Sequence, residues 1–316
     1  SYAQSEFDSG YTESTRYLYK QALCAVLGLG CMAAFSRIPA ELWRRAAWHI
    51  YGISIALLLA VLVVGQSVNG AKRWVSIAGI QFQPSEIAKF AVILVFARLS
   101  RVYGPKAAEF RYGILGFGAA LMGILIPLAL EKHLSAILLI GMVAVVMMFL
   151  SGTRMKYLLM GAALAACFVL VYITFMGYAG DRVTAWLDPQ SDPSDTGYQI
   201  LQSLYAIGSG GVFGLGFGRG RQKSLYLPFQ YNDYIFAIVC EELGLLGAAG
   251  IMALFAALIL RGYHIARSAR DRFSAMLCAG LTTLLAVQTV LNLCVVTKML
   301  PSTGIALPFF SYGGTA

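Results

Sequence analysis

Residues 225–244 read LYLPFQYNDYIFAIVCEELG, and they decide the fold because a polar loop through Asn232 and Asp233 runs directly into an apolar stretch of helix length. Further apolar segments precede and follow it. The chain is 59% hydrophobic and 12% charged, with a mean hydropathy of +0.71, whereas soluble domains carry roughly 25% charged residues. We therefore expect an integral membrane protein that holds Asp233 at a membrane boundary.

Several apolar runs approach the roughly 20 residues that a helix needs to cross a bilayer. None shows the alternation of a transmembrane barrel strand, so helices must satisfy the backbone in lipid. The sequence therefore predicts an all-α, polytopic membrane protein, with residues 1–316 forming one transmembrane domain. The predicted spans lie near residues 18–36, 47–65, 86–103, 112–130, 134–151, 157–178, 234–260 and 274–297.

The two ends of the chain look incomplete. The polar start SYAQSE has no preceding span, and PSTGIALPFFSYGGTA stops inside an apolar segment broken by prolines and glycines. We interpret the C-terminal segment as an unfinished ninth span, a helix tolerated at membrane depth because protein or a cavity covers it. The sequence is therefore expected to be a fragment that lacks a first helix and the end of the last.

Basic residues gather in alternate loops, and short basic loops mark the cytoplasmic side of a membrane protein. The segments 66–85, 131–133 and 179–232, together with the N-terminus, are then expected on the outer side. The long outer loop, 179–232, is of a length that is usually functional or disordered. The basic residues of the alternate loops are Arg37, Arg44, Arg45, Arg98, Arg101, Lys106, Arg154, Lys156, Arg261, Arg267, Arg270 and Arg272.

Composition also excludes several classes of function. The net charge of +9 is explained by loop orientation rather than by nucleic acid. The six cysteines lie in apolar segments without C-x-x-C spacing, which argues against a zinc site or a disulfide framework. The glycine-rich GSGGVFGLGFGRGRQK follows no strand, so it is not a dinucleotide fingerprint.

Asp233 has two interpretations on residue type alone. A carboxylate just before the span 234–260 is typical of a helix N-cap, where it accepts backbone amide hydrogen bonds and meets the positive end of the helix dipole. It could also act as a general base toward a hydroxyl, or hold a divalent cation such as Mg²⁺ or Mn²⁺. The dipole is expected to keep it ionised, which suits each role.

A second polar stretch, NGAKRWVSIAGIQFQPSEIAKF, lies on the same expected side. Pro84 and Glu86 fit a helix start, and Lys89 follows Glu86 on the same helix face, so a local ion pair is the simple interpretation. Charges near membrane depth more often face a cavity. Lys72 and Arg73 could there bind a phosphate or pyrophosphate, beside Trp74 as an interfacial ring.

Other polar residues are expected to have structural roles. Glu131 and His133 occupy the shortest outer turn and are expected to be solvated at the interface. Glu241 and Glu242 lie about two turns into a span, so at least one is expected to be buried in a polar contact between helices. Gln202 could line the outer site or be an ordinary loop residue. A transporter and an enzyme for a lipid pyrophosphate both fit these residues.

Five separated segments, in order, resemble the SEDS family of peptidoglycan polymerases, the FtsW, RodA and SpoVE group. They are GAKRW, QPSEIAKF, GYQILQSLYAIGSGG, QKSLYLP followed by NDYIFAIVCEELG, and PSTGIALPFFSYGG. The resemblance covers almost the whole chain. It implies about ten transmembrane helices in the complete family fold, of which about eight to nine are present here.

The resemblance also implies a function. Family members polymerise lipid II at the outer face of the bacterial cytoplasmic membrane, and Asp233 matches the aspartate that would activate the acceptor hydroxyl. Trp74, Gln83, Lys89 and Gln202 match residues needed for activity, and Arg73 and Lys72 are the cations that we add from charge. The implied partners are lipid II, undecaprenyl-linked glycan and a class B penicillin-binding protein, with no nucleic acid and no certain cofactor.

The chain departs from the family pattern at several positions. Phe229 replaces a usual glutamate, Lys132 and His133 replace a usual Pro-Asp or Pro-His pair, and Gly220 and Arg221 precede the Gln-Lys pair. Phe229 removes a carboxylate that could assist Asp233. The alternatives to a polymerase are therefore a lipid II flippase or transporter and a non-catalytic scaffold for a transpeptidase. The pattern is nearer to the division and sporulation branches than to the elongation branch.

Overall fold

The computed structural model describes residues 12–68, 71–77, 80–175, 177–191, 196–220 and 233–311. Each of the eight predicted spans corresponds to a helix, so the expectation of an all-α, polytopic fold is confirmed. The helices are α2 (Thr12–Ser36), α3 (Ala40–Val64), α4 (Pro84–Tyr103), η1 (Gly104–Ala108), η2 (Arg111–Gly116), α5 (Phe117–Leu130), α6 (Leu134–Leu150), α7 (Met155–Phe175), α8 (Gly177–Leu187), η3 (Pro189–Ser191), α9 (Thr196–Gly210), α10 (Ile235–Ser268) and α11 (Arg272–Val296).

By length and composition, four helical segments of the described ranges could cross a membrane: Ala40–Val64, Arg111–Leu130, Ile235–Ser268 and Arg272–Val296. Shorter apolar helices, including Leu134–Leu150, stand beside them. Helix α4 is different, because it carries charges at both ends and lies at the centre of the bundle. It packs against α3, α5, α6 and α11, and its residues Ile93, Leu94 and Phe96 are fully buried.

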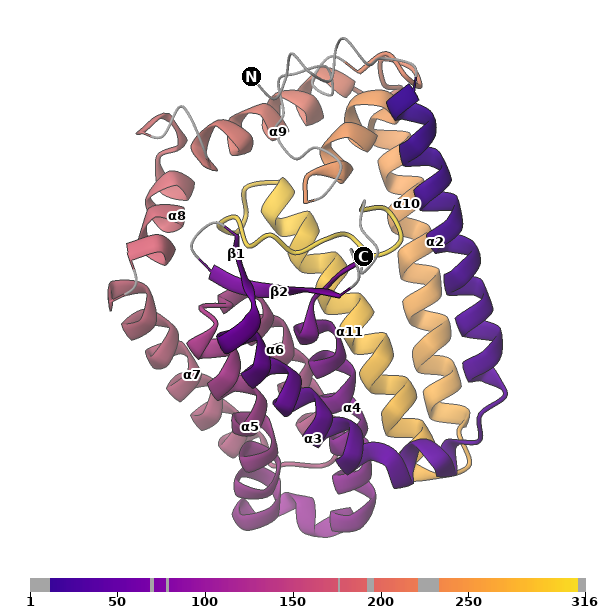
Figure 1. Cartoon of the computed structure of the whole chain (residues 1–316), viewed down its shortest axis with the longest axis vertical. Coiled ribbons are helices and arrows are strands. Elements are labelled where there is room, and N and C mark those ends of the chain that lie inside the picture. Colours follow the sequence, from indigo (N-terminus) through magenta and orange to yellow (C-terminus); the bar gives the residue numbers. More distant parts are fainter. Residues whose placement is uncertain are drawn as a thin grey trace.

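One end of the bundle, which we call the loop end, holds structure that the sequence did not predict. A three-stranded antiparallel sheet, β1 (Gln66–Val68), β2 (Ala71–Ile77) and β3 (Ile80–Phe82), follows α3. The long segment 179–232 was expected to be a loop, but its described parts contain the end of α8, then η3 and α9 (Figure 1). Trp186 Nε1 of α8 donates to the carbonyl of Lys298 at 3.0 Å, which ties this segment to the chain after α11.

The C-terminal segment is not helical where it is described. Residues 301–307 are irregular, and residues 308–311 form a turn. The expectation of an interrupted helix in this segment is therefore wrong for residues 301–311. Side chains of α11 satisfy its backbone, since Gln288 Nε2 donates to the carbonyl of Ala306 at 3.0 Å and Asn292 Nδ2 to that of Ile305 at 2.8 Å. Protein thus covers the irregular backbone, as was predicted.

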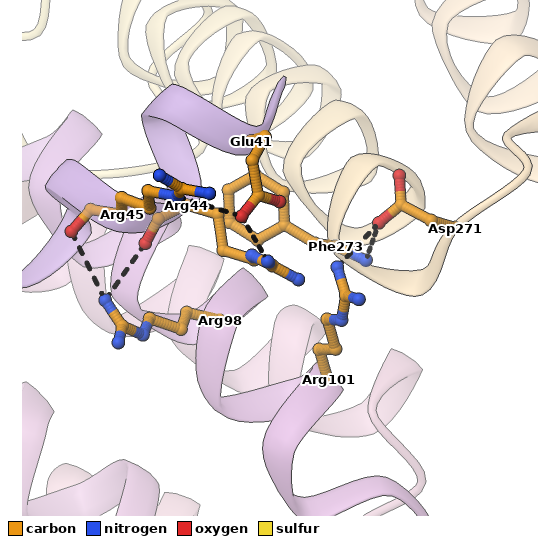
Figure 2. A network of polar contacts seen from close by, with 7 residues as sticks. All are labelled: Glu41, Arg44, Arg45, Arg98, Arg101, Asp271 and Phe273. Carbon is orange, nitrogen blue, oxygen red and sulfur yellow. Dashed lines mark hydrogen bonds and ion pairs between the residues drawn. The ribbon is translucent and has the colours of Figure 1, made fainter. Parts of the chain in front are cut away.

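The opposite end of the bundle gathers the basic loops, and we call it the basic end. Figure 2 shows its polar network, formed by Glu41, Arg44, Arg45, Arg98, Arg101, Asp271 and Phe273. Arg98 donates to the backbone carbonyl of Arg44 at 3.0 Å, and Asp271 caps α11 by accepting from the amide of Phe273 at 2.9 Å. Arg272 joins three helices, because it donates to Ser100 Oγ at 3.2 Å and to the carbonyl of Ser151 at 2.8 Å. The alternate basic loops therefore lie at one end, as predicted.

Candidate functional site

Asp233 lies at the loop end, immediately before α10, but it is not the N-cap of that helix. The N-cap position belongs to Tyr234, and no side chain caps the helix there. Asn292 of α11 holds this backbone instead: its Nδ2 donates at 2.8 Å both to the carbonyl of Asp233 and to that of Ile305. The N-cap interpretation is therefore wrong, and the side chain of Asp233 is left for another role.

Gly304 provides the surface against which the carboxylate rests. A Cβ atom at Gly304 would stand 3.4 Å from Asp233 Oδ2, so the carboxylate lies against the glycine backbone. Gly304 has a φ of +67°, in the left-handed region that favours glycine. The irregular C-terminal segment is thus a wall of the site around Asp233.

Arg182 of α8 supplies the positive charge near Asp233. Its Nη1 donates to the carbonyl of Ser302 at 3.0 Å, two residues from Gly304. Burial raises the pKa of the Asp233 carboxyl, and the Arg182 charge acts in the opposite direction and lowers it. The expected source of stabilisation was the helix dipole, and the structure places the guanidinium of Arg182 there as a counter-charge. Sequence analysis missed this residue, because α8 and Asp233 are far apart along the chain.

A second set of ionisable residues, separate from Asp233 and Arg182, lies around the turn between α5 and α6. Arg73 of β2 donates through Nη2 to the carbonyl of Lys132. Glu131 is only 3% exposed and His133 only 8%, so the expectation that they are solvated is wrong. Burial raises the pKa of Glu131 to about 8, against the lowering effect of Arg73. Burial, Arg73 and Lys89 together lower the pKa of His133 to about 3.

Lys89 lies on the α4 side of this second set. It is 7% exposed, and its Nζ stands 2.6 Å from Glu86 Oε2, so the predicted ion pair is present. Pro84 occupies the first turn of α4, also as predicted, and Gln83 is the N-cap residue without a capping hydrogen bond from its side chain. The charges of Arg73 on β2 and of Lys89 on α4 both lower the pKa of His133, so each lies within electrostatic range of that imidazole.

The C-terminal segment connects Asp233 and Arg182 to the residues around the α5–α6 turn. Ser135, in the first turn of α6, donates through Oγ to the carbonyl of Thr303. Thr303 precedes Gly304, which contacts Asp233, and Ser135 is two residues after His133. A few residues of irregular chain therefore separate the Asp233 carboxylate from the α5–α6 turn that carries His133.

Buried polar atoms lie on both sides of that chain. Within the described ranges, Glu131 Oε1, His133 Nδ1, Thr303 Oγ1 and Asn292 Oδ1 are buried without a hydrogen-bond partner. Buried polar groups of this kind are uncommon in folded proteins. At the loop end they leave hydrogen-bonding capacity on both sides of the C-terminal segment.

The remaining predicted site residues are Trp74, Lys72 and Gln202, and the structure places each of them on its element. Trp74 is half-buried on β2, and Lys72 is placed by its backbone pairing with Ser67. Gln202 is half-buried on α9, and no contact to Asp233 is seen for it among the described residues. Its neighbour Ser203 is fully buried and donates to the carbonyl of Val296 at 2.9 Å, which is a structural role.

The prediction that at least one glutamate of the span after Asp233 is buried is confirmed. Glu241 and Glu242 are both buried, as expected for at least one of them, and they lie against Gly220 of the glycine-rich segment. Phe229, which replaces the usual family glutamate, lies outside the described residues, as does Arg221.

A divalent cation at Asp233 stays a prediction. Within the described ranges, no group of three or more His, Cys, Asp or Glu side chains could hold a metal ion. The described surroundings of Asp233 include the charge of Arg182, which donates to the Ser302 carbonyl. No step below uses a metal.

A bundle of apolar helices with a half-buried carboxylate and two cations at one end defines a polytopic membrane protein with a polar site at the membrane boundary. The family model of the FtsW, RodA and SpoVE proteins, described as "Cell cycle protein", matches residues 1–316. The chain belongs to this family, as the resemblance in its motifs predicted.

Named relatives agree over nearly the whole chain. The probable peptidoglycan glycosyltransferase FtsW of Geobacter sulfurreducens is 39% identical over 316 residues, which cover 99% of this chain and 84% of the relative. The peptidoglycan glycosyltransferase MrdB of Escherichia coli is 38% identical, with coverage of 92% and 79%. A solved structure described as "Structural coordination of polymerization and crosslinking by a peptidoglycan synthase complex" matches with a TM-score of 0.80 at 28% identity, covering 99% of this chain and 89% of the other.

Proposed function

We propose that this chain is a peptidoglycan glycosyltransferase that polymerises lipid II, with Asp233 as the general base. The observation that carries the proposal is the placement of a half-buried carboxylate beside Arg182 and Gly304, a few residues of chain away from the α5–α6 turn on whose His133 the charges of Arg73 and Lys89 act. Asp233 can therefore take a proton, while Arg73 and Lys89 can stabilise negative charge. The relatives named as peptidoglycan glycosyltransferases support the same reaction class.

In the proposed reaction, Asp233 removes the proton from the 4-hydroxyl of the acceptor sugar. The hydroxyl oxygen then forms a bond to the anomeric carbon of the lipid-linked donor chain, with inversion at that carbon. The bond from the anomeric carbon to the pyrophosphate oxygen breaks, and its electron pair leaves with undecaprenyl pyrophosphate. The proton stays on Asp233 until it is lost to water, so charge and atoms balance.

The cations are assigned to the leaving group. Arg73 and Lys89 both act electrostatically on His133 at the turn between α5 and α6, and guanidinium groups bind phosphate oxygens well. Lys72 precedes Arg73 on β2 and is proposed as a third cation, with Trp74, Gln83 and Gln202 as further substrate contacts. Stabilising the developing charge on pyrophosphate is a large contribution to such a reaction.

Replacement of Asp233 tests the base. Asp233→Asn in the purified protein should lower the rate of glycan chain formation from lipid II by about 10²- to 10⁴-fold, as expected for loss of a general base. The readout is the length and amount of product on a gel. Asp188→Asn is the matched control, because Asp188 is an exposed carboxylate on the same end of the bundle. Full polymerisation by Asp233→Asn would remove Asp233 from the proposed role.

A lipid II flippase is the second candidate, favoured by the ion pair of the buried Lys89 with the half-buried Glu86 and by the irregular segment after α11. Reconstituted vesicles separate the two functions. A flippase moves labelled lipid II between leaflets without lengthening it, and it tolerates Asp233→Asn. A polymerase makes glycan chains, and it loses this activity on that substitution.

Partner and location follow from the same proposal. The solved relative is described as a peptidoglycan synthase complex that coordinates polymerisation and crosslinking, so we expect a class B penicillin-binding protein as partner of this chain. We also assign the protein to the bacterial cytoplasmic membrane, with its basic end in the cytoplasm. Co-purification of a transpeptidase with the tagged full-length protein tests the partner.

A further inference from the structure

The glycine-rich loop, residues 211–220, is attached to an interruption in α10. Gly244 has a φ of +67° and a ψ of −168° inside that helix, so the helical hydrogen bonds stop there. The loop replaces them. The amides of Leu215 and Gly216 donate to the carbonyls of Glu241 and Glu242 at 2.9 and 3.0 Å.

Hydrogen bonds in the other direction complete the attachment. The amides of Leu245 and Leu246 donate to the carbonyls of Gly211 and Val212 at 2.9 and 3.2 Å. The backbone on both sides of the interruption is therefore satisfied by protein, which is the condition for irregular chain at membrane depth.

The height of this attachment follows from the length of α10. Arg261 is the first charged residue after the apolar stretch that follows the interruption. Leu245, the first residue after the interruption, lies about 16 residues earlier, which is about 24 Å of helix at about 1.5 Å per residue. The hydrocarbon core of a bilayer is about 30 Å thick, so this length spans most of it. When Arg261 lies at one membrane boundary, the loop lies near the other, at the level of the outer acyl chains.

The side chains of the loop are apolar and exposed. Phe213 is 82% exposed and Phe217 88%, and Val212 and Leu215 are also exposed. Through the hydrogen bonds at the interruption, the loop adjoins Leu245 and Leu246, two exposed side chains of the membrane-spanning helix. Large apolar patches on a protein surface mark an interaction site.

An arginine of the loop lies at the edge of this apolar surface. Arg219 is exposed and lies two residues after Phe217. Arginine at a membrane boundary extends its charged head toward lipid phosphates while its stem stays in apolar surroundings. Aromatic and apolar side chains with an adjacent cation, at the level of a membrane boundary, fit an interfacial lipid environment.

We propose that the glycine-rich loop inserts Phe213 and Phe217 among the lipids of the leaflet opposite the basic end. The occupant of this surface is the outer part of the acyl chains, with Arg219 at the lipid phosphates. The loop, held on α10 by backbone hydrogen bonds, fixes the height of the loop end relative to the lipid headgroups. This insertion does not depend on which reaction the site performs.

Tryptophan at the loop tests the insertion. The full chain with Phe217→Trp or Phe213→Trp is reconstituted in vesicles of phosphatidylglycerol and phosphatidylethanolamine, with and without bromine on the acyl chains near the headgroup. The expected result is fluorescence quenching by the brominated lipids, above that of the wild-type protein with its 4 tryptophans. Aqueous iodide should quench the added tryptophan weakly.

Two matched variants calibrate the measurement. Leu254→Trp lies on the exposed apolar face of α10 and should be quenched by acyl chains brominated deeper in the bilayer. Gln190→Trp lies on exposed η3 at the loop end and should be quenched by iodide. Iodide quenching at position 217 as strong as at 190 would place the loop in water and overturn the proposal. Resistance to both quenchers would mean that protein, rather than lipid, covers the loop, and would overturn it too.

Discussion

At the scale of single residues, the ionisation of Asp233 depends on Arg182. Burial raises the pKa of the Asp233 carboxyl, and the guanidinium lowers it. A general base must be ionised, so the acid side of the pH–rate profile follows this pKa. Arg182→Gln removes the lowering charge, and the acid limb of polymerisation should therefore move to higher pH.

Arg182→Lys is the matched variant for this prediction. It keeps the positive charge and should leave the acid limb nearer to the wild-type position, although its ammonium cannot reproduce the guanidinium geometry at the Ser302 carbonyl. The profiles are measured as initial rates of glycan formation against pH. An acid limb that stays in place in Arg182→Gln would show that this charge does not set the ionisation of the base.

Glu131 should make stability depend on pH. Its pKa is raised from 4.5 to about 8 by burial, so the folded protein holds this proton more tightly than the unfolded chain. The contribution of Glu131 to stability is complete at low pH and is lost as pH rises from about 5 to about 8. Glu131→Gln stays neutral, so its apparent Tm in detergent should fall less over that interval. Parallel Tm curves for the two proteins would contradict the buried, protonated glutamate.

Local sequence predicted the contacts and burial of some of these residues but not of others. The Glu86–Lys89 pair is set by helical spacing, and the burial of Glu241 follows from its position in a span. The partners of Asp233 and Arg73 come from elements distant in sequence, α8, α11 and the α5–α6 turn. Those contacts depend on how the helices pack, which residue types alone do not determine.

At the scale of elements, the interruption of α10 requires a glycine at position 244. A Cβ atom there would stand 2.3 Å from the amide nitrogen of Gly214 and 2.5 Å from the carbonyl oxygen of Val212. Backbone strain at positive φ adds to this clash. Gly244→Ala should therefore cost at least about 1–3 kcal/mol of stability, measured as a lower apparent Tm and a lower yield of monodisperse protein.

Gly250→Ala is the control on the same helix. Nothing lies within 4 Å of a Cβ atom at Gly250, and alanine is favoured over glycine in a helix by up to about 1 kcal/mol. This variant should match or exceed the wild-type Tm. Equal behaviour of the two substitutions would argue against the hydrogen-bonded interruption at Gly244.

The elements divide into those that composition predicts and those that it does not. Apolar runs of membrane-spanning length each became a helix, because lipid leaves the backbone few alternatives. The strands β1–β3 and the helices α8 and α9 are polar or mixed in composition and lie outside the predicted spans. Their structure is determined by tertiary contacts, such as Trp186 to the carbonyl of Lys298 and Ser203 to that of Val296.

At the scale of the whole molecule, the two ends of the bundle have distinct chemistry. The basic end is joined by arginines, with Arg272 bound to Ser100 and Ser151 and Arg98 bound to the carbonyl of Arg44. The loop end holds Asp233 and the buried residues of the α5–α6 turn. The proposed reaction occurs outside the cytoplasmic membrane, so its assignment requires the basic end to face the cytoplasm.

Cysteine labelling tests that requirement. In a chain freed of its 6 native cysteines, Gln190→Cys on η3 should react with a membrane-impermeant maleimide in intact spheroplasts, because it is exposed at the loop end. Arg270→Cys, exposed at the basic end, should react only after the membrane is permeabilised. The reverse pattern would put Asp233 on the cytoplasmic side, where a half-buried base with Arg182 beside it could still perform chemistry but could not extend glycan chains outside. Orientation thus decides whether the geometry of the site can serve the proposed reaction.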